Sequence, residues 1–406
     1  MANTTYSLDW VLNPVSKDDF YKNYWEKKPL LIPRADNNYF KDLLSSEQIE
    51  EMVSTLDPKR NEFDMVNADE QVKRNLFIDD DGRVNPSGVF KLFDQGATMI
   101  LQRLHRRHPQ LARFCAAMEA EFSHQFQTNI YFTPAKAKGF KVHYDTHDVF
   151  VLQVEGEKDW SIYNEAVELP ISGQHFERGK HELGEETMTF HLKAGDMVYI
   201  PRGWMHEARS LDSNSLHITV GALTYSWADF ITDAVGAVCM SEPSLRNALP
   251  SGYAKADYDT SQMLELFEEH LKTIAEKSDF DKTHKHFKDM FVNSRRPLMT
   301  NQLKQLNNVD TLSLNSTLAP REQLFYQLSQ DDEQAKKGEE SIAQCHIQSN
   351  GQIISLPAFA YDPIKYSLEA KSFKVKDLPG GLDDESKLVL MRRMVREGLI
   401  ELQGLS

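Results

Sequence analysis

A short stretch of the chain, KVHYDTHDVF at residues 141–150, concentrates side chains that bind metal ions. His143 and Asp145 are two positions apart, so on a strand they would present an imidazole and a carboxylate on one face. A third ligand, His206, follows the run GDMVYIPRGWM about sixty residues later. Two imidazoles and one carboxylate on one face of an octahedron leave three positions open, which suits non-haem Fe(II). We therefore predict an iron site made by His143, Asp145 and His206.

Several neighbouring side chains are weaker candidates for this site. His147 continues the alternation, but a fourth protein ligand would leave too little room for a cosubstrate and oxygen, so we expect it outside the ligand set. Asp148 alternates to the other side and leads into an apolar strand, which indicates a structural role. Arg202 and Trp204 are expected to line a groove, or in the case of Arg202 to pair with an acid. Three further histidines lack ligand spacing and are expected at the surface: His175, His181 and His191.

The elements that position these residues are expected to be strands. From residue 129 the chain contains short segments rich in β-branched and aromatic residues, separated by Gly, Pro, Asn or Asp: NIYFT, VHYD, DVFVLQVEG, DWSIY, TMTFHL, DMVYIP and SLHITVGAL. Several short strands at close spacing predict a sandwich or barrel.

The segments on either side of the strands are expected to be mainly helical. Before residue 125, Ser16 is a predicted N-cap, Leu30 to Ile32 a strand, and SSEQIEEMVSTL a helix with Ile49, Met52 and Leu56 on one stripe. After residue 226, a longer helix is expected to carry a stripe of four apolar residues: Met263, Phe267, Leu271 and Ile274. Residues 331–341 are charged and predicted to form a surface loop.

The end of the chain contains a further predicted helix in DDESKLVLMRRMVREGL, capped by Asp383 or Asp384 and ended by Gly398. Its apolar stripe is Leu388, Met391 and Val395. The segments together predict an α-helical beginning, a β core, a helical middle and a small C-terminal α/β domain.

The residues around the predicted ligands resemble a known family. NIYFTPAKAKGFKVHYDTHDVFVLQVEGEKDWSIY and GDMVYIPRGWMHEARSLDSNSLHITVG are similar to the JmjC-type, cupin-fold 2-oxoglutarate oxygenases, and within them to the ribosomal oxygenases. YWEKKPLLI and LPGGLDDESKLVLMRRMVREGLI resemble the same group near its two ends. The resemblance implies an α+β fold with a double-stranded β-helix (jelly-roll, cupin) core, a helical N-terminal region, a helical middle domain and a winged-helix-like C-terminal domain. The implied domains are 1–228, 229–305 and 306–406.

The resemblance also assigns residues to a cosubstrate. Lys158 matches the basic residue that pairs with the far carboxylate of 2-oxoglutarate, and Ser215 matches a hydroxyl that helps to bind it. Asn129 and Tyr131 match pocket positions nearby, although both could instead be polar packing at a barrel mouth. His217 is expected either beside this site or simply buried in the barrel. A buried dicarboxylate requires a cation and hydrogen-bond donors, which agrees with these assignments.

Composition and charge limit the partners of the chain. With 46 Lys and Arg against 61 Asp and Glu, the net charge is -15, which argues against binding a nucleic-acid backbone and favours a basic partner. The C-terminal segment has no basic stripe, so direct DNA binding is not expected. No apolar window is long enough for a bilayer, no signal peptide opens the chain, and the three scattered cysteines fit a reducing compartment. We therefore expect a cytoplasmic protein.

The resemblance implies a homodimeric hydroxylase that uses Fe(II) and 2-oxoglutarate to modify an arginine or histidine of a ribosomal protein. Three alternatives remain open at this stage. The substrate could be a small molecule or a peptide; the chain could be a non-catalytic cupin that binds a partner; or it could demethylate lysine, although no residue selects methyl-lysine.

Overall fold

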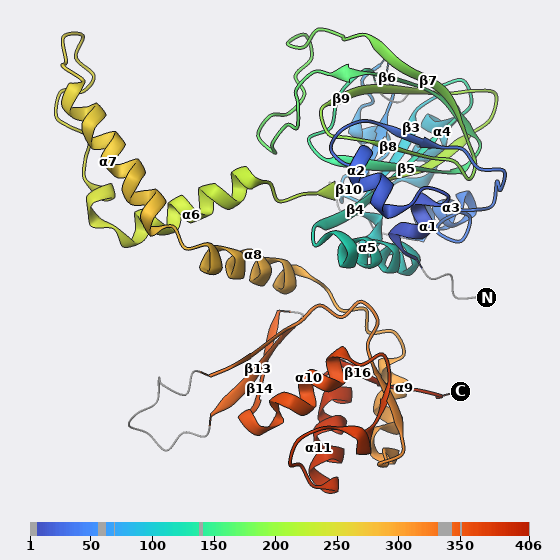
Figure 1. The fold of residues 1–406 in the computed structure, drawn as a ribbon. Coiled ribbons are helices and arrows are strands. Elements are labelled where there is room, and N and C mark those ends of the chain that lie inside the picture. The colour runs from blue at the N-terminus through green and yellow to red at the C-terminus, as the bar shows by residue number, and fades with distance from the viewer. Residues whose placement is uncertain are drawn as a thin grey trace. The chain divides into compact units, whose positions relative to one another are not determined.

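The computed structural model describes residues 6–55, 62–68, 70–137, 141–331, 343–349 and 351–405. It divides into two compact units, Met1–Thr224 and Tyr225–Ser406 (Figure 1). The predicted three-domain division, with boundaries at 228/229 and 305/306, stays a prediction.

The first unit is built on two antiparallel sheets. Within the described residues, seven strands form the larger sheet in the order β1-β8-β5-β10-β4-β3-β2, and three form the smaller sheet in the order β7-β6-β9. The larger sheet consists of β1 (Leu30–Ile32), β2 (Phe63–Val66), β3 (Thr98–Gln102), β4 (Gln125–Thr133), β5 (Asp148–Glu155), β8 (Met197–Ile200) and β10 (Ser215–Leu223). The smaller sheet consists of β6 (Glu157–Glu165), β7 (Glu186–Lys193) and β9 (Trp204–Ser210).

The two sheets face each other across a small apolar core. Val149 and Val151 of β5 pack there with Trp160 and Ile162 of β6. Both central strands of the larger sheet, β5 and β10, are buried at nearly every position, because both of their faces are covered. The predicted α+β class with a β-sandwich core is confirmed.

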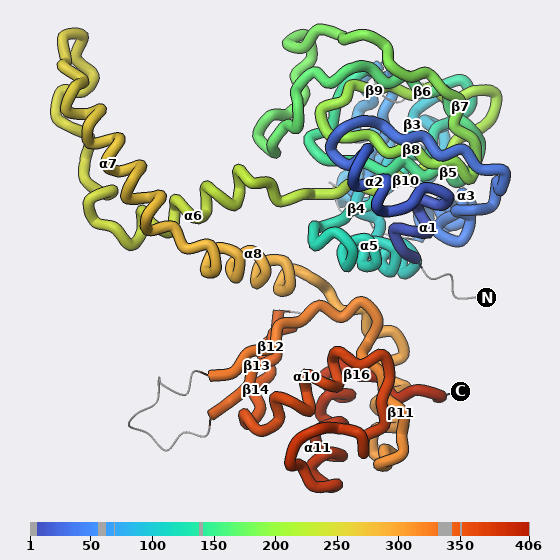
Figure 2. The backbone as a smooth tube through the Cα atoms, in the orientation of Figure 1, coloured from blue at the N-terminus to red at the C-terminus, as the bar shows by residue number. Residues whose placement is uncertain are grey.

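Helices cover the outer face of the larger sheet (Figure 2). Phe20 lies 5.0 Å from Tyr199 of β8 between ring centroids, and Phe114 belongs to the same buried cluster as Phe150 of β5. The helices are α1 (Leu8–Leu12), α2 (Lys17–Asn23), α3 (Ser46–Thr55), α4 (Pro86–Asp94) and α5 (Pro109–Phe122). The apolar faces of these helices therefore complete the core from the side opposite the smaller sheet.

The N-terminal predictions are confirmed in part. Ser16 caps α2 by accepting a hydrogen bond from the amide of Asp19, and β1 spans the predicted residues. In α3 Ile49 is buried and Met52 partly buried, whereas Leu56 lies outside the described residues. The mainly helical prediction missed β2 and β3, whose short runs carry no clear alternation.

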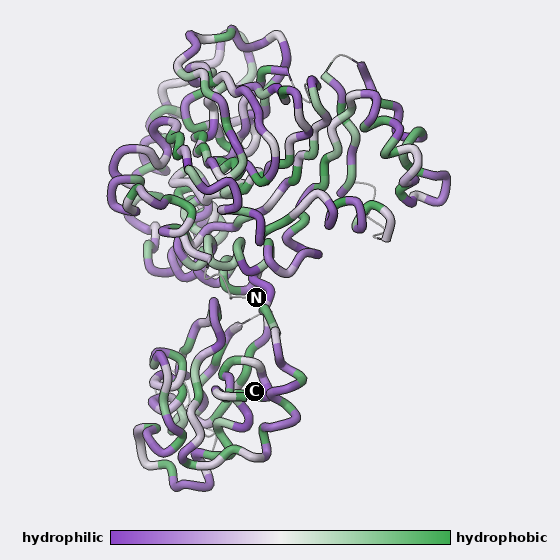
Figure 3. The backbone as a smooth tube through the Cα atoms, turned by 90° about the vertical axis from the view of Figure 1, so that its right-hand side faces the viewer, coloured by the Kyte–Doolittle hydropathy of each residue, from purple (hydrophilic) through white to green (hydrophobic). Residues whose placement is uncertain are grey.

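The second unit begins with α6 (Trp227–Ser241), α7 (Ser261–Lys277) and α8 (Phe280–Ser294). No described residue of α7 is buried, although its apolar side chains follow the predicted stripe. Phe267 is 57% exposed and Leu271 is 49% exposed. Figure 3 colours the backbone by hydropathy and shows hydrophobic (green) and hydrophilic (purple) residues interspersed along the chain. Two residues of the predicted stripe, Phe267 and Leu271, are therefore exposed, whereas Met263 and Ile274 are partly buried.

The rest of the second unit is a mixed α/β structure around its own core. Its helices are α9 (Gln302–Asn308), α10 (Tyr361–Glu369) and α11 (Asp384–Arg396). One sheet joins β15 (Phe373–Lys374), β11 (Thr317–Pro320) and β16 (Ile400–Leu402), and the other joins β12 (Gln327–Gln330), β13 (Gln344–Ser349) and β14 (Gln352–Pro357).

Helix α11 follows its prediction closely. Asp383 is the N-cap and accepts from the amide of Ser386, while Met391 and Val395 are fully buried. Gly398 follows the helix with φ of +74°, a left-handed conformation that glycine adopts without strain. Most of the predicted loop at 331–341 lies outside the described residues. Within the described chain, no helix is long and apolar enough to cross a membrane.

Candidate metal centre

Two chain segments bring the predicted ligands together. His206 lies on β9, and a single antiparallel bridge pairs it with His143 through hydrogen bonds between backbone N and O of 3.2 and 2.8 Å. Asp145 lies in the turn before β5, where its carbonyl accepts from the amide of Gly203 at 3.0 Å. The segment VHYD is therefore irregular with one β-bridge, not the predicted strand, because its ladder with β9 is limited to the pair His143 and His206.

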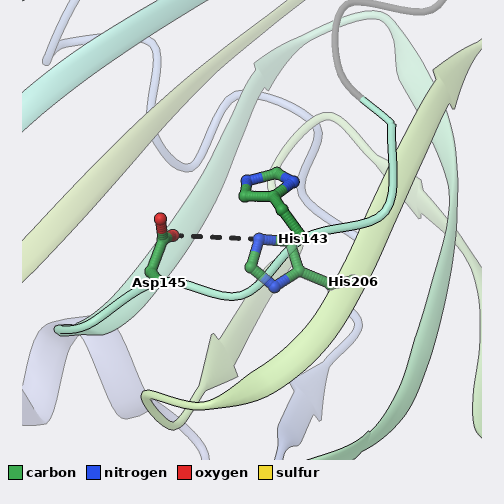
Figure 4. A group of neighbouring side chains, drawn as sticks. All are labelled: His143, Asp145 and His206. Atoms are coloured by element: carbon green, nitrogen blue, oxygen red, sulfur yellow. Dashed lines mark ion pairs between the residues drawn. The ribbon is translucent and has the colours of Figure 1, made fainter. Parts of the chain in front are cut away.

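The three side chains point toward one another (Figure 4). One potential ligand atom from each of His143, Asp145 and His206 lies within 4.8 Å of the other two, and His206 Nε2 is 3.8 Å from Asp145 Oδ2. His206 is 6% exposed, and the other two are partly buried. Among the described residues, this is the group of His, Cys, Asp and Glu side chains whose spacing fits a metal ion.

Backbone carbonyls orient both imidazoles. Nδ1 of His143 is 2.9 Å from the carbonyl oxygen of Lys141, and Nδ1 of His206 is 3.0 Å from that of Trp204. Because a carbonyl oxygen only accepts, each Nδ1 must carry the proton, which leaves each Nε2 with a lone pair. Both histidines thus hold the tautomer that a metal ligand at Nε2 requires.

The electrostatics of the group favour the same protonation states. Burial, assisted by the nearby His143, lowers the pKa of His206 to about 4, so its imidazole is neutral at pH 7. Burial works to raise the pKa of Asp145, yet the imidazoles of His147, His206 and His143 together hold that pKa below its ordinary value. A neutral imidazole at His206 and an ionised carboxylate at Asp145 are the forms that bind divalent metals.

The same cavity, about 540 Å³ including its open mouth, contains a buried cation. Lys158 on β6 is 4% exposed, and its Nζ donates to Thr133 Oγ1 at 2.9 Å and lies 3.3 Å from His217 Nδ1. No acidic side chain among the described residues pairs with it, and burial lowers its pKa to about 7. The ring of Trp160 lies between the two groups, 6.1 Å from His206 and 5.8 Å from His217 between centroids.

The structure places the other predicted cosubstrate residues differently. Tyr131 lines the cavity and stacks on His217, with ring centroids 5.0 Å apart. Ser215 is fully buried and accepts from Gln153 Nε2 at 2.7 Å, so its hydroxyl does not line the cavity. Asn129 likewise lies outside the cavity lining, because its Oδ1 accepts from the backbone amide of Arg103 at 3.1 Å.

Sequence reasoning missed the hydroxyl that does contact Lys158. Thr133 lies two residues after Tyr131 on β4, so the alternation that selected Asn129 and Tyr131 continues to it. Thr133 also accepts from Thr98 of β3 at 3.2 Å, which fixes its side chain. Thr133 thus supplies the hydroxyl that contacts Lys158, whereas the hydroxyl of Ser215 contacts Gln153 and its predicted role stays a prediction.

The structure also shows the contacts of His147 and Arg202, two weaker candidates near the ligands. His147 lies against Gly221 of β10, where an added Cβ would come within 2.5 Å of the imidazole, and it is not part of the ligand group. Arg202 is buried and pairs with Asp148, the second of its two predicted alternatives.

Two of the histidines expected at the surface have specific contacts. His181 packs on Tyr144, with ring centroids 5.2 Å apart, and His191 lies between two carboxylates on the smaller sheet. Spacing along the sequence carried no signal for either contact, because both join separate chain segments.

Comparisons with known proteins agree with this geometry. Residues 82–230 match the JmjC domain family. The chain is 30% identical over 284 residues to the bifunctional lysine-specific demethylase and histidyl-hydroxylase NO66 of Aedes aegypti, covering 66% of this chain and 44% of that protein. It is 31% identical over 248 residues to ribosomal oxygenase 2 of Bos taurus, covering 59% and 53% respectively.

Among solved structures, the chain resembles YcfD, a ribosomal oxygenase from Escherichia coli. The TM-score is 0.55 at 16% identity, over 96% of this chain and 99% of that one, which shows a common fold. Another structure of YcfD, with a TM-score of 0.54, 16% identity and the same coverage, is a complex with cobalt and 2-oxoglutarate. The chain spans about half the length of the curated relatives it matches.

Proposed function

We propose, for a chain that belongs to the JmjC-domain ribosomal oxygenase family, that the protein is an Fe(II)- and 2-oxoglutarate-dependent protein hydroxylase. One observation carries the proposal: an open two-histidine, one-carboxylate group shares its cavity with a buried lysine that lacks an acidic partner among the described residues. Iron bound there with 2-oxoglutarate and oxygen would supply the oxidising power for hydroxylation.

The residues of the chain divide the work between two parts of the cavity. His143, Asp145 and His206 would hold the ion, and the backbone carbonyls bonded to the two Nδ1 atoms orient the imidazoles for this role. Lys158 and Thr133 receive the far carboxylate of 2-oxoglutarate. An ammonium group that is buried without a counter-charge is costly, and a carboxylate bound beside it removes that cost.

The proposed substrate is a basic ribosomal protein, hydroxylated on an arginine or histidine side chain. The names of the relatives, ribosomal oxygenase and histidyl-hydroxylase, support this choice, and the net charge of -15 suits a basic partner. The protein is proposed to act in the cytoplasm, a location that the name of the relative ribosomal oxygenase 2 supports.

The second unit is proposed to mediate dimerisation of the protein. A homodimer formed through α6, α7 and α8 would cover the apolar side chains that these helices expose, including Trp227 at 73% and Phe280 at 62%. The remaining helices and sheets are proposed to form the winged-helix-like domain, without direct DNA binding. The role of this domain is proposed to be a scaffold or a wall of the substrate groove.

The proposal is tested by measuring conversion of 2-oxoglutarate to succinate with Fe(II) and oxygen, with and without purified ribosomal proteins. One ribosomal protein should stimulate turnover and gain a mass of about 16 Da, the mass of one oxygen atom, on a single residue. Turnover without stimulation would favour a small-molecule or peptide substrate, and loss of methyl groups would favour lysine demethylation. Absence of turnover with iron bound and every ribosomal protein supplied would contradict the proposal.

A further inference from the structure

Arg202 is buried between two carboxylates close to the candidate metal centre. Its Nη1 lies 2.7 Å from Asp148 Oδ2 and 2.5 Å from Glu26 Oε1. Asp148 is fully buried and Arg202 is 7% exposed. Replacing such buried ion pairs by apolar residues is often neutral or stabilising, because desolvation offsets the attraction. Stability alone therefore gives a weak reason for placing three charges here.

The position of the pair suggests what else it does. Asp148 follows Asp145 by three residues, and Arg202 precedes His206 by four, so the pair joins the two segments that carry the ligands. The backbone amide of Arg202 also donates to Asp148 Oδ1 at 3.4 Å, and the next amide, that of Gly203, donates to the carbonyl of Asp145. The two turns are thus fastened by side-chain and main-chain bonds together.

The N-terminal part of the chain completes this arrangement. Tyr199 donates its hydroxyl hydrogen to Asp148 Oδ1 at 2.7 Å and accepts from the backbone amide of Glu26 at 2.9 Å. Glu26 has φ of +56°, a left-handed conformation that is uncommon outside glycine. That conformation directs a second carboxylate onto Arg202. We call these four residues (Glu26, Asp148, Tyr199 and Arg202) the Arg202 network.

We infer that the Arg202 network is a positioning device for the metal ligands, which fixes the turn bearing Asp145 against the strand bearing His206. The inference rests on the proposed function, because it concerns the metal that His143, Asp145 and His206 are proposed to bind. None of the four side chains lies among the ligand group. The network acts on the metal through the spacing of the two turns. Its loss should loosen the ligand geometry even in a folded protein.

The test uses Co(II), whose visible absorption reports the coordination geometry, on the full-length chain. Arg202→Lys keeps the charge but replaces the planar guanidinium, whose Nη1 contacts both carboxylates, by an ammonium group on a flexible stem. We expect about a tenfold weaker Kd for Co(II), the lower end of the effects seen for groups around metal ligands, and altered absorption bands. Glu26→Gln, which leaves the pair with Asp148 intact, should produce a smaller shift of both readouts in the same direction.

A matched control exists in the second unit. Arg321 is 5% exposed, and its Nη1 lies 2.8 Å from Glu401 Oε1, so Arg321→Lys disturbs a comparable buried pair in the compact unit that does not contain the ligands. This control should lower the melting temperature and leave the Co(II) affinity and spectrum unchanged.

The outcomes separate the inference from the proposed function. Wild-type affinity and spectrum in a folded Arg202→Lys protein would overturn the inference. If Arg202→Lys does not fold, Glu26→Gln decides in the same way. A wild-type chain that binds no Co(II) would overturn the proposed function and this inference with it, whereas binding that none of the network variants changes overturns the inference alone.

Discussion

The β core of the first unit and the helices α6 to α8 depart from the usual distribution of residues in opposite ways. The core encloses charged and polar side chains, among them Lys158 at 4% and His206 at 6% exposure. The helices instead expose large apolar side chains such as Trp227 and Phe267. Exposed leucines and buried valines are ordinary, but buried charges and exposed aromatic clusters require a reason. The first departure points to a ligand and the second to a partner protein.

The largest effect should follow from removing a buried ligand. In His206→Ala one of the three metal ligands is lost, so we expect 2-oxoglutarate turnover to fall below detection and Co(II) binding to weaken sharply. Circular dichroism should still report a folded protein, because the cavity around residue 206 opens to solvent. Wild-type turnover in a folded His206→Ala protein would contradict the explanation that the buried polar residues of the β core form a ligand site.

Lys158 tests the other end of the cavity. Lys158→Met removes the charge, and hydrogen bonds to charged groups contribute about 1.5–3 kcal/mol, so the Kd for 2-oxoglutarate should rise by about 10- to 100-fold. Calorimetric titration with Zn(II) in place of iron measures this without turnover. Lys158→Arg, which keeps a cation, should lose less. Equal losses in both variants would indicate that Lys158 is a packing residue.

Introducing a charge on the exposed face of α7 should weaken the proposed dimer, whereas in the β core the expected loss follows from removing a charge. Phe267→Glu places a carboxylate in the proposed dimer interface, and because each buried apolar side chain is worth about 1.5–3 kcal/mol, the dimer Kd should rise by tenfold or more. Sedimentation equilibrium measures this constant. Glu269→Lys changes a charge on the same helix outside the apolar stripe. As a control, this variant should leave the dimer Kd nearly unchanged. A wild-type chain that sediments as a monomer would contradict the partner explanation.

Binding of 2-oxoglutarate should depend on pH through Lys158. Burial lowers the pKa of this amine to about 7, so the cationic form that binds a carboxylate prevails below pH 7 and is lost above it. The Kd should therefore rise by up to about tenfold per pH unit above 7 and flatten below 7. Calorimetry between pH 6 and 9 tests the slope. A constant Kd over this range would mean that Lys158 stays charged despite its burial.

The smallest effect is expected from an exposed polar group on the same sheet. A hydrogen bond with Asp159, aided by Glu157, raises the pKa of His191 above its ordinary value of 6.5. This histidine therefore stabilises the fold below pH 6.5, and the contribution is lost as pH rises through its folded pKa. Because the pair is exposed, the effect should be less than about 1 kcal/mol. Denaturant unfolding of the wild type and His191→Gln at pH 5.5 and 9 measures it.

Much of the fold was predictable because many of its helices and strands are determined by residues that are close together in the sequence. The caps at Ser16 and Asp383, the strand at Leu30–Ile32 and the apolar runs of β5 and β10 are set by neighbouring residues. β9 was missed because WMHEARS alternates weakly, and its strand form depends on pairing with β6.

The candidate site also contains residues that the sequence could predict and residues that it could not. His143, Asp145 and His206 could be selected by residue type and spacing, and the structure brings them together. The contact between Thr133 and Lys158 could not be foreseen, since it joins β4 and β6, which belong to different sheets. Glu26 was equally hidden, because its contact with Arg202 spans 176 residues.

The order of the larger sheet bears on how the chain should be cut for experiments. The match to the JmjC domain begins at residue 82, yet β1 and β2, the two outermost strands of that sheet, both precede it. A fragment trimmed to residues 82–230 would leave β8 and β3 with unpaired backbone amides and carbonyls along both rims. Open rims of this kind recruit strands from other molecules, so such a fragment should aggregate. The N-terminal segment therefore supplies both edge strands of the larger sheet and protects its interior strands from pairing with other molecules.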